Sequence, residues 1–514
     1  MLTLRPYQKE PVRKAIEYFR EDNAEPSLMV MPTAAGKSII AASVAAASTA
    51  PLLVVQPTKE LLEQNLDKYR QLCGEMAPAG VYSASFGKKE IDIVTFATIG
   101  SIYKLGDRFK ALGFTRMLID EAHLYPHKES SMLGQFLKES GIRQVLGVTA
   151  TPLKLEQFSE KQGERFDKWS TLTMLTNPSP DGTFFKRILH INQISEMTAG
   201  GYWSPLKYEI MPYERKYLSL NAAGNEYSEN STVTAYQANN VRDNIIAALD
   251  YHKERKHIIV FVPSVDEAVL LSSIYPGSAA LSGETPKKER AETVKMFKEG
   301  KIRVLFNVAL FITGFDYPQT DMIVLAAPTA SVARYYQAAG RGVRTAEGKK
   351  DCIIADMAGL YGRFGLVEDI TFEHDGRWRM YGTGGTLMSG IPIGCLGAVH
   401  RGDVEAAAGR GLKDMAMPMG KYKGKRIAEL PQSYITWYMN SGEDVTLRRA
   451  MLDAMEQRIR DTRLEAPLTA LPDGQYAGEE IGTVPRPYLK WYYGSKVWNE
   501  TNDSLRRGVE IYLQ

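Results

Sequence analysis

Short apolar runs alternate with longer, mixed stretches through about the first 350 residues of the chain. Seven of these runs are short enough to be buried strands, and they lie at 52–55, 91–96, 117–119, 145–149, 258–262, 304–308 and 322–325. Buried strands that alternate with helical stretches are typical of parallel sheets covered by helices. The runs form two groups, separated by a more polar stretch from about 160 to 250. The pattern therefore predicts two α/β domains.

A phosphate-binding loop is indicated at residues 31–38, which read Met-Pro-Thr-Ala-Ala-Gly-Lys-Ser. The apolar run 28–31 predicts a strand before the loop, and the Ala-rich run 39–47 predicts a helix after it. In such a turn the backbone N–H groups face phosphate at a helix N-terminus, an ammonium reaches the β- and γ-oxygens, and a hydroxyl meets Mg²⁺. The pattern usually begins with Gly, where this chain has Met31. The candidate ATP-binding residues of this loop are Thr33, Ala34, Ala35, Gly36, Lys37 and Ser38.

A second motif, Leu-Ile-Asp-Glu-Ala-His at 118–123, ends another apolar run. A carboxylate at the C-terminal end of a strand can hold Mg²⁺ through water, and its neighbour can orient the water that attacks the γ-phosphate. We assign the first role to Asp120, together with Ser38, and the second to Glu121. ATP and Mg²⁺ are thus the expected cofactors.

A third motif, Gln-Ala-Ala-Gly-Arg-Gly-Val-Arg, lies at 337–344. If this segment is helical, Gln337, Arg341 and Arg344 fall on one face. A second domain that closes over nucleotide could then place Arg341 and Arg344 against the charge that develops on the γ-phosphate, and such arginines contribute about 10³ to 10⁵ in rate. A solvated basic helix is the alternative. We therefore name Lys37, Asp120, Glu121, Gln337, Arg341 and Arg344 as candidate catalytic residues.

These motifs and several others, in the same order, resemble those of superfamily 2 helicases and translocases of the DEAH-box type. The others lie at 4–8, 54–64, 94–98, 148–152, 259–264 and 313–318. The resemblance covers residue 4 to about 345 and implies two tandem RecA-like domains with ATP between them. The wording of the phosphate loop is similar to that of phage branch-migration helicases such as UvsW, and the segment 200–205 looks RadD-like.

The resemblance also implies roles for single residues. Tyr7 and Gln8 would recognise adenine, and Gly314 and Asp316 would contact ATP. Residues that couple the ATP site to nucleic acid would be His123, Thr149 and Thr151. The phosphates of one strand would be contacted across both domains by Pro57, Thr58, Thr95, Phe96, Ser264 and Thr313.

The C-terminal part of the chain contains an internal repeat. Residues 417–438 and 471–492 align without gaps at an offset of 54, and nine of the 22 positions are identical. In the first copy these positions are Pro418, Gly420, Tyr422, Gly424, Ile427, Pro431, Tyr434, Trp437 and Tyr438. Each copy is predicted to form a short hairpin with a Gly turn, then a Pro-initiated helix in which Tyr and Trp anchor the core. It resembles a small domain of unassigned role that is appended to some bacterial and phage nucleases.

The two copies differ in charge. The first hairpin carries Lys421, Lys423, Lys425 and Arg426, whereas Gln475, Ala477, Glu479 and Glu480 stand at the same places in the second. Only the first hairpin suits phosphates, so we expect its three lysines to contact duplex or branched DNA and the second copy to brace it or bind a protein partner. Two structural modules with a solvated basic turn are the alternative.

Composition changes this picture little. The 514 residues are 44% hydrophobic and 24% charged, as in soluble globular proteins, and a net charge of +3 is too small to indicate nucleic-acid binding by itself. The three cysteines are far apart, which argues against a disulfide framework or a structural zinc site and fits a reducing cytosol. No stretch has the character of a signal peptide or a membrane span. We expect a cytoplasmic protein, in the host cytoplasm if it is phage-encoded, with no membrane partner.

The expected fold class is α/β, with two tandem RecA-like parallel-sheet domains and a small α+β C-terminal region made of two repeated modules. The expected parts are an ATP-binding domain at 1–190, a connecting segment at 191–245, a second RecA-like domain at 246–375, a Gly-rich flexible or irregular connector at 376–412, and the two modules at 413–464 and 465–514.

The expected function is that of an ATP-dependent DNA helicase or translocase. Forked, branched or single-stranded DNA would be its partner, and remodelling in replication, repair or recombination its task. Three alternatives stay open: an RNA helicase, an ATP-gated nucleic-acid-binding switch, and the motor subunit of a defence or restriction assembly.

Overall fold

The computed structural model describes residues 3–21, 24–126, 128–162, 165–178, 182–221, 224–308, 317–398, 415–442, 444–464, 475–476, 484–485 and 487–488. The chain divides into two compact units. The first comprises Met1–Gln157, Trp169–Asn177 and Asp181–Gly402, and the second comprises Phe158–Lys168, Pro178–Pro180 and Asp403–Gln514. The domain limits expected from the sequence stay predictions.

The first unit begins with an eight-stranded sheet in the order β10-β1-β7-β6-β2-β5-β3-β4. Its strands are β1 (Ser27–Val30), β2 (Leu52–Gln56), β3 (Gly80–Ser83), β4 (Lys88–Lys89), β5 (Val94–Thr98), β6 (Arg116–Asp120), β7 (Gln144–Thr149) and β10 (Arg187–Ile191). All neighbours pair in parallel except β3 and β4. The apolar runs therefore form strands as predicted, and the carboxyl ends of β1, β7, β6, β2 and β5 meet at one edge of the sheet.

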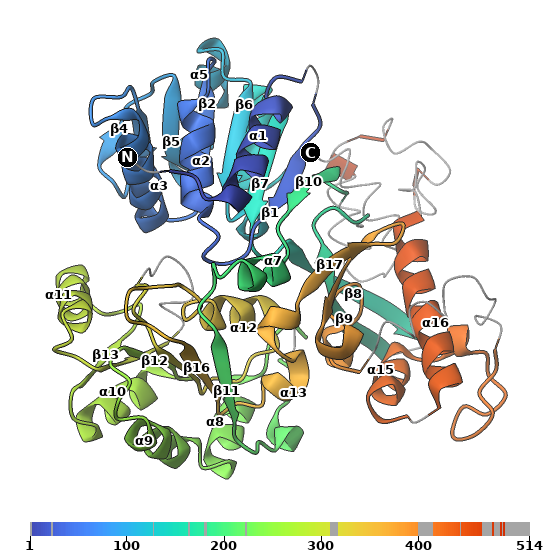
Figure 1. Ribbon diagram of the computed structural model, residues 1–514. Helices are drawn as coiled ribbons and strands as arrows, with labels where there is room; N and C mark the ends of the chain where they lie inside the picture. Colours follow the sequence, from blue (N-terminus) through green and yellow to red (C-terminus); the bar gives the residue numbers. More distant parts are fainter. Residues whose placement is uncertain are drawn as a thin grey trace. The chain divides into compact units, whose positions relative to one another are not determined.

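Helices cover this sheet, and together they form the first lobe. They are α1 (Pro6–Tyr18), α2 (Lys37–Ala46), α3 (Lys59–Cys73), α4 (Ile99–Ile102), α5 (Gly106–Ala111) and α6 (Met132–Ser140). A further helix, α7 (Ile194–Ala199), follows β10. Figure 1 shows α1, α2 and α3 side by side in front of the sheet, and α2 contacts both of the others. The expected Ala-rich helix is α2, whose small side chains allow its neighbours and the sheet to approach closely.

A six-stranded parallel sheet in the order β11-β16-β15-β12-β14-β13 forms the second lobe. Its strands are β11 (Leu206–Ile210), β12 (Ile258–Phe261), β13 (Ser278–Leu281), β14 (Val304–Asn307), β15 (Met322–Leu325) and β16 (Cys352–Asp356). Its helices are α8 (Glu229–Ala238), α9 (Val241–Tyr251), α10 (Val265–Ile274), α11 (Lys287–Lys298), α12 (Val332–Ala339) and α13 (Tyr361–Phe364). The two parallel sheets confirm the expected α/β class with two RecA-like domains.

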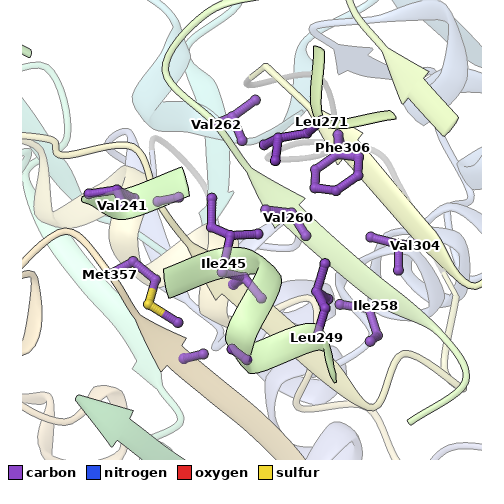
Figure 2. Close-up of a cluster of buried hydrophobic side chains, with 14 of the residues drawn as sticks. Val241, Ile245, Leu249, Ile258, Val260, Val262, Leu271, Val304, Phe306 and Met357 are labelled. Carbon is purple, nitrogen blue, oxygen red and sulfur yellow. The ribbon is translucent and has the colours of Figure 1, made fainter. Parts of the chain in front are cut away.

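The core of the second lobe lies between this sheet and α9 (Figure 2). Val241, Ile245 and Leu249 recur along one face of α9, at the spacing that places apolar residues on one side of a helix. They meet β-branched and aromatic side chains from β12 and β14, among which Phe306 is fully buried. Burial of this apolar area is what holds α9 on the sheet.

Two smaller sheets complete the described strands. The hairpin of β8 (Leu153–Gln162) and β9 (Arg165–Met174) forms one, and the antiparallel β17 (Thr371–His374), β18 (Trp378–Gly382) and β19 (Thr386–Leu387) form the other. The expectation of an irregular connector from residue 376 is wrong over β18 and β19. Apolar residues between the glycines, such as Met380, Met388 and Ile391, are buried there and give the segment a core of its own.

The described part of the second unit contains α15 (Gln432–Ser441) and α16 (Val445–Leu464). The expected Gly turn is present, since Met417 N–H donates to the Lys425 carbonyl and Gly420 and Gly424 have φ values of 78° and 82°. Pro431 precedes α15 as expected. The expected core role of Trp437 is wrong, because its side chain is 57% exposed while Ile435 and Met439 of the same helix are buried.

Truncation of Phe306 tests the core of the second lobe. Phe306→Ala removes a fully buried ring and leaves a cavity, so the free energy of unfolding of this lobe should fall by about 3–5 kcal/mol. Val269→Ala on α10, where the side chain is 55% exposed, should change it by less than about 0.5 kcal/mol. Urea unfolding of the full chain checks both, and equal effects of the two variants would contradict this core.

Candidate nucleotide and nucleic-acid site

The candidate phosphate loop leaves the first sheet beside two strands that carry other candidate residues. β1 pairs in parallel with β7, where Val30 is in register with Thr149, and Asp120 of β6 is in register with Val148. The Met31 N–H donates to the Thr149 carbonyl over 2.9 Å. The parallel topology therefore brings residues about 30, 120 and 150 together at one edge.

The loop backbone is held in an unusual conformation. Gly36 has φ 79° just before α2, and a Cβ at this position would lie 2.5 Å from Gln8 Nε2. Ala34 has φ 63° and Glu121 has φ 49°, a region that costs side-chain-bearing residues free energy. Of the three described non-glycine residues with positive φ, two thus lie in this site. Strain concentrated in this way is typical of functional positions.

The charged residues of the two motifs face each other. Lys37 Nζ lies 3.3 Å from Glu121 Oε1, and both side chains are only 14% exposed. Asp120 is buried, accepts a hydrogen bond of 3.0 Å from Asn65 Nδ2, and also accepts one from the Glu121 N–H. Asn65 lies on α3, and sequence reasoning missed it because one amide on a helical face carries no recognisable signal.

The two carboxyl groups differ in their pKa. Burial, followed by the charge of Glu121, raises the pKa of Asp120 to about 6. Burial acts to raise the pKa of Glu121. The charge of Lys37, followed by that of His123, the hydrogen bond from Lys37 and the charge of Arg341, outweighs burial, so the pKa lies below its ordinary value. Glu121 is therefore ionised beside Lys37, as a group that accepts a proton must be.

A polar chain leads from Glu121 to the second lobe. His123 Nδ1 lies 2.8 Å from Thr149 Oγ1 and 3.5 Å from Glu121 Oε2, and its Nε2 lies 3.4 Å from Gln337 Nε2. The Thr149 hydroxyl also accepts from the Thr151 N–H over 3.0 Å. Burial lowers the pKa of His123, which favours the neutral ring. His123, Thr149 and Thr151, the three residues predicted to couple the ATP site to nucleic acid, are thus linked to one another and, through His123, to Gln337.

The expected single helical face for Gln337, Arg341 and Arg344 is wrong. α12 ends at Ala339, and Gly340 and Gly342 follow. A Cβ at Gly340 would lie 2.6 Å from Thr33 Cγ2, so a glycine is needed where this turn meets the phosphate loop. Arg341 is 8% exposed, and its Nε donates to the Gln337 carbonyl over 3.3 Å, whereas the backbone of Arg344 pairs with Trp203.

Gln8 and Tyr7 contact the phosphate loop itself. Gln8 Nε2 donates to the Ala35 carbonyl over 2.9 Å, while Gln8 Oε1 accepts from the Arg5 N–H over 2.9 Å. The Tyr7 hydroxyl donates to the same Ala35 carbonyl over 3.2 Å. Both the nitrogen and the oxygen of the Gln8 amide make hydrogen bonds, and the bond from the nitrogen links α1 to the phosphate loop. Adenine recognition stays a prediction.

Three aromatic residues outside the predicted set also reach this region. Trp203 Nε1 donates to the Thr33 carbonyl over 3.1 Å, and the Thr33 N–H donates to Tyr336 Oη over 3.1 Å. The Tyr202 ring lies 4.5 Å from the Tyr7 ring. Tyr202 and Trp203 lie in the segment 200–205, which resembled RadD in sequence, but no role was predicted for either residue. Nothing in the sequence pointed to Tyr336 except its position next to Gln337.

The residues predicted to face nucleic acid in the first lobe differ in their exposure to solvent. Pro57 and Thr58 follow β2 and are partly exposed, and Thr58 Oγ1 caps α3 by accepting from the Leu61 N–H. Thr95 and Phe96 are fully buried in β5. Thr95 bonds to the backbone of Asp92, and Phe96 packs on Tyr69. Both side chains point into the core of a sheet that is covered on both faces, and contact of Thr95 and Phe96 with nucleic acid stays a prediction.

The remaining predicted contacts lie elsewhere. Ser264 follows β12, caps α10 by accepting from the Glu267 N–H over 3.2 Å, and lines a cavity of about 910 Å³. Lys421, Lys423 and Lys425 are exposed in the second unit. Thr313, Gly314 and Asp316 lie outside the described residues.

Comparison with known families gives three matches. Residues 1–154 match the model "Type III restriction enzyme, res subunit". Residues 240–346 match "Helicase conserved C-terminal domain". Residues 410–444, which include the first repeat, match "Putative quorum-sensing-regulated virulence factor".

Individual relatives agree with the first two matches. The chain is 23% identical to the putative mitochondrial ATP-dependent helicase irc3 of Schizosaccharomyces pombe, over 72% of this chain and 60% of that protein. It is also 23% identical to the DNA 3'-5' translocase XPB2 of Sulfurisphaera tokodaii, over 68% of this chain and 80% of that protein. A solved fragment of a putative HsdR subunit of a type I restriction enzyme from Vibrio vulnificus has a TM-score of 0.50 at 18% identity, covering 70% of this chain and 65% of that one.

These matches support a superfamily 2 nucleic-acid helicase or translocase. The first match lies in the first lobe and the second match lies in the second lobe, and the solved fragment supports the fold. The name of the irc3 relative states that it depends on ATP. In the described part of the chain, no helix is long and apolar enough to cross a membrane.

Replacement of Trp203 tests its bond to the phosphate loop. Trp203→Phe keeps a buried ring but removes the N–H that meets the Thr33 carbonyl, and a buried acceptor without a partner costs about 1–3 kcal/mol. We expect the affinity for a fluorescent ATP analogue to fall on the order of tenfold. Trp378→Phe on β18 is the matched control and should leave it unchanged; the same affinity for both variants would contradict a role of Trp203 in holding the loop.

Proposed function

We propose that the protein is an ATP-dependent DNA helicase or translocase. One observation carries the proposal: the residues around Lys37 and Glu121 in the first lobe meet Gln337 and Arg341 of the second. A site assembled from two lobes changes when the lobes move, which is what coupling of hydrolysis to movement along a strand requires.

The residues present fit ATP with Mg²⁺. Glu121 Oε2 is buried and accepts no hydrogen bond, with His123 Nδ1 3.5 Å away, so this carboxylate keeps an acceptor for a water molecule beside the phosphates. Lys37 and the amides that precede α2 would hold the phosphates, and Ser38 and Asp120 would hold Mg²⁺. When bound, the metal would neutralise charge on the phosphate oxygens.

Each charged side chain then has one task. Ionised Glu121 accepts a proton from the attacking water, and Lys37 holds Glu121 in place until phosphate takes its ammonium. Arg341 lies near enough to lower the pKa of Glu121 and would stabilise charge on the γ-phosphate. The chain from Glu121 through His123 to Gln337 would report the state of the site to the second lobe.

DNA as the substrate is supported by the relative whose name states DNA translocation, and by the resemblance to RadD-like and UvsW-like helicases. We propose forked or branched DNA in replication, repair or recombination as the setting. The motor subunit of a restriction assembly is a second candidate, favoured by the match of residues 1–154 to a restriction-enzyme subunit. The chain covers 60% of the irc3 helicase, so the activity of the whole relative is carried over only as part of this proposal.

Duplication of the C-terminal module is supported by matching contacts. The rings of Tyr422 and Tyr434 lie 4.7 Å apart at 66°, and those of Tyr476 and Tyr488 lie 4.7 Å apart at 68°. Tyr434 N–H donates to the Pro431 carbonyl, as Tyr488 N–H donates to the carbonyl of Pro485. All of these positions are related by the offset of 54.

ATP turnover with different nucleic acids tests the proposed function. We expect little hydrolysis without nucleic acid and the strongest stimulation by forked DNA, with Lys37→Ala setting the background. Stimulation by RNA alone would overturn the DNA assignment. A rate that no nucleic acid raises above background would contradict a nucleic-acid motor that acts alone and favour the restriction-subunit candidate.

Arg341 is expected to act in hydrolysis rather than in binding. Arg341→Ala should lower kcat for ATP by roughly 10³-fold or more while the affinity for the ATP analogue changes little, since an arginine finger acts on the transition state. Arg13→Ala on α1, which removes a 55% exposed arginine, should leave kcat unchanged. An equal loss of analogue affinity and kcat in Arg341→Ala would place this residue in ground-state binding instead.

A further inference from the structure

The first C-terminal module presents an aromatic ring where a core residue was expected. Trp437 lies on α15 and is 57% exposed, while Ile435 and Met439 of the same helix are buried in the module. A large apolar side chain held this far in solvent is unusual and often marks a binding surface.

Trp437 is one end of a continuous row of rings. Its ring centroid lies 5.4 Å from that of Tyr434, and Tyr434 lies 4.7 Å from Tyr422. The Lys421 and Lys425 ammonium groups lie 5.3 Å and 5.9 Å from the centre of the Tyr422 ring. Lys423 lies on the same hairpin and is exposed. We call Lys421, Tyr422, Lys423, Lys425, Tyr434 and Trp437 the Trp437 face.

The charge of this face is not neutralised within the described residues. Lys421, Lys423 and Lys425 are exposed, and no described carboxylate lies within ion-pair distance of them. The ion pair described in this hairpin joins Arg426 to Glu429 instead. Three cations within five residues, on the same face as the exposed Trp437 ring, are therefore available to an anionic ligand.

This combination of groups selects among possible ligands. Successive bases of a single strand can stack on aromatic rings while lysines meet the phosphates between them. In a duplex the phosphates are accessible but the base faces are stacked inside. A duplex would therefore contact the lysines, and no base would stack on Trp437. A protein partner would gain the ring but would have to cover lysines, which are depleted in protein interfaces.

We propose that the Trp437 face binds single-stranded DNA, with a base stacked on Trp437 and phosphates held by Lys421, Lys423 and Lys425. This inference rests on the proposed function and deepens it, because it names single-stranded rather than duplex or branched DNA as the ligand of the first module. The face would add a second contact with the strand and thereby raise the affinity for substrates with a free strand.

The second repeat provides a contrast in the same chain. It keeps the Tyr476 and Tyr488 rings in the arrangement of Tyr422 and Tyr434. Gln475, Ala477 and Glu479 replace the three lysines, and Trp491 is the sequence counterpart of Trp437. With its phosphate-binding groups missing, the second repeat would bind a single strand weakly or not at all.

The test measures the affinity of the full chain for a fluorescent oligo(dT) without nucleotide. Trp437→Ala should weaken binding on the order of tenfold, and Trp437→Phe, which keeps a stacking ring, should restore most of it. Replacement of Lys421, Lys423 and Lys425 by Ala should reduce the slope of log affinity against log salt by about two, at roughly 0.7 per phosphate of a single strand. Trp491→Ala and Tyr251→Ala, the latter removing a 79% exposed ring from α9, should have little effect.

Distinct outcomes separate this inference from the proposed function. Unchanged oligo(dT) affinity in Trp437→Ala, with ATP turnover still stimulated by DNA, would overturn the Trp437 face alone. Equal weakening on oligo(dT) and on blunt duplex would assign the face to phosphates rather than bases and also overturn it, and tighter binding to oligo(U) than to oligo(dT) would overturn the choice of DNA. If no DNA stimulates the unmodified protein, the proposed function fails, whatever the variants do.

Discussion

The peptide group of Thr33 is the point on which the candidate ATP site depends. Its N–H is taken by Tyr336 on α12, and its carbonyl is taken by Trp203 in the segment that leads to the second sheet. Gly340 packs directly against the Thr33 methyl group. A loop that would otherwise belong to the first lobe alone is thus fixed by residues of the second. Phosphate that binds the loop must affect these bonds, and movement of the second lobe must affect the loop.

The same arrangement explains why strained backbone is found here. Ala34 and Glu121 have positive φ, and the contacts of Ala35 with Gln8 and of Glu121 with Lys37 hold both in place. A loop without positive φ at these residues would be less strained, but its amides would no longer face the position where phosphate binds. Preorganisation of this kind keeps the loop amides directed at the position where phosphate binds.

The sequence predicted the elements that depend on local pattern and missed those that depend on tertiary contact. Apolar runs identified the central strands. The motifs singled out Asp120 and Glu121 at the end of β6 and Lys37 at the start of α2. The prediction of a helix through Arg341 was wrong because two glycines follow α12. Gly340 lies close to Thr33 and Gly342 lies close to Cys352, and such tertiary contacts cannot be read from local sequence. Thr95 was assigned to nucleic acid by motif alone, and the motif did not reveal that its neighbours in a covered sheet bury it. Trp437 was assigned to a core because sequence cannot tell which face of an aromatic helix meets the rest of its module.

A structure of the full chain with single-stranded DNA and an ATP analogue that mimics the γ-phosphate tests the central claim most directly. The quantity to measure is the distance from the γ-phosphate mimic to Lys37 Nζ and to the Arg341 guanidinium. The account predicts hydrogen-bond distance for both, with Lys37 released from its ion pair to Glu121. A mimic bound to the loop while Arg341 stays on the Gln337 carbonyl, out of reach, would contradict a site shared between the two lobes.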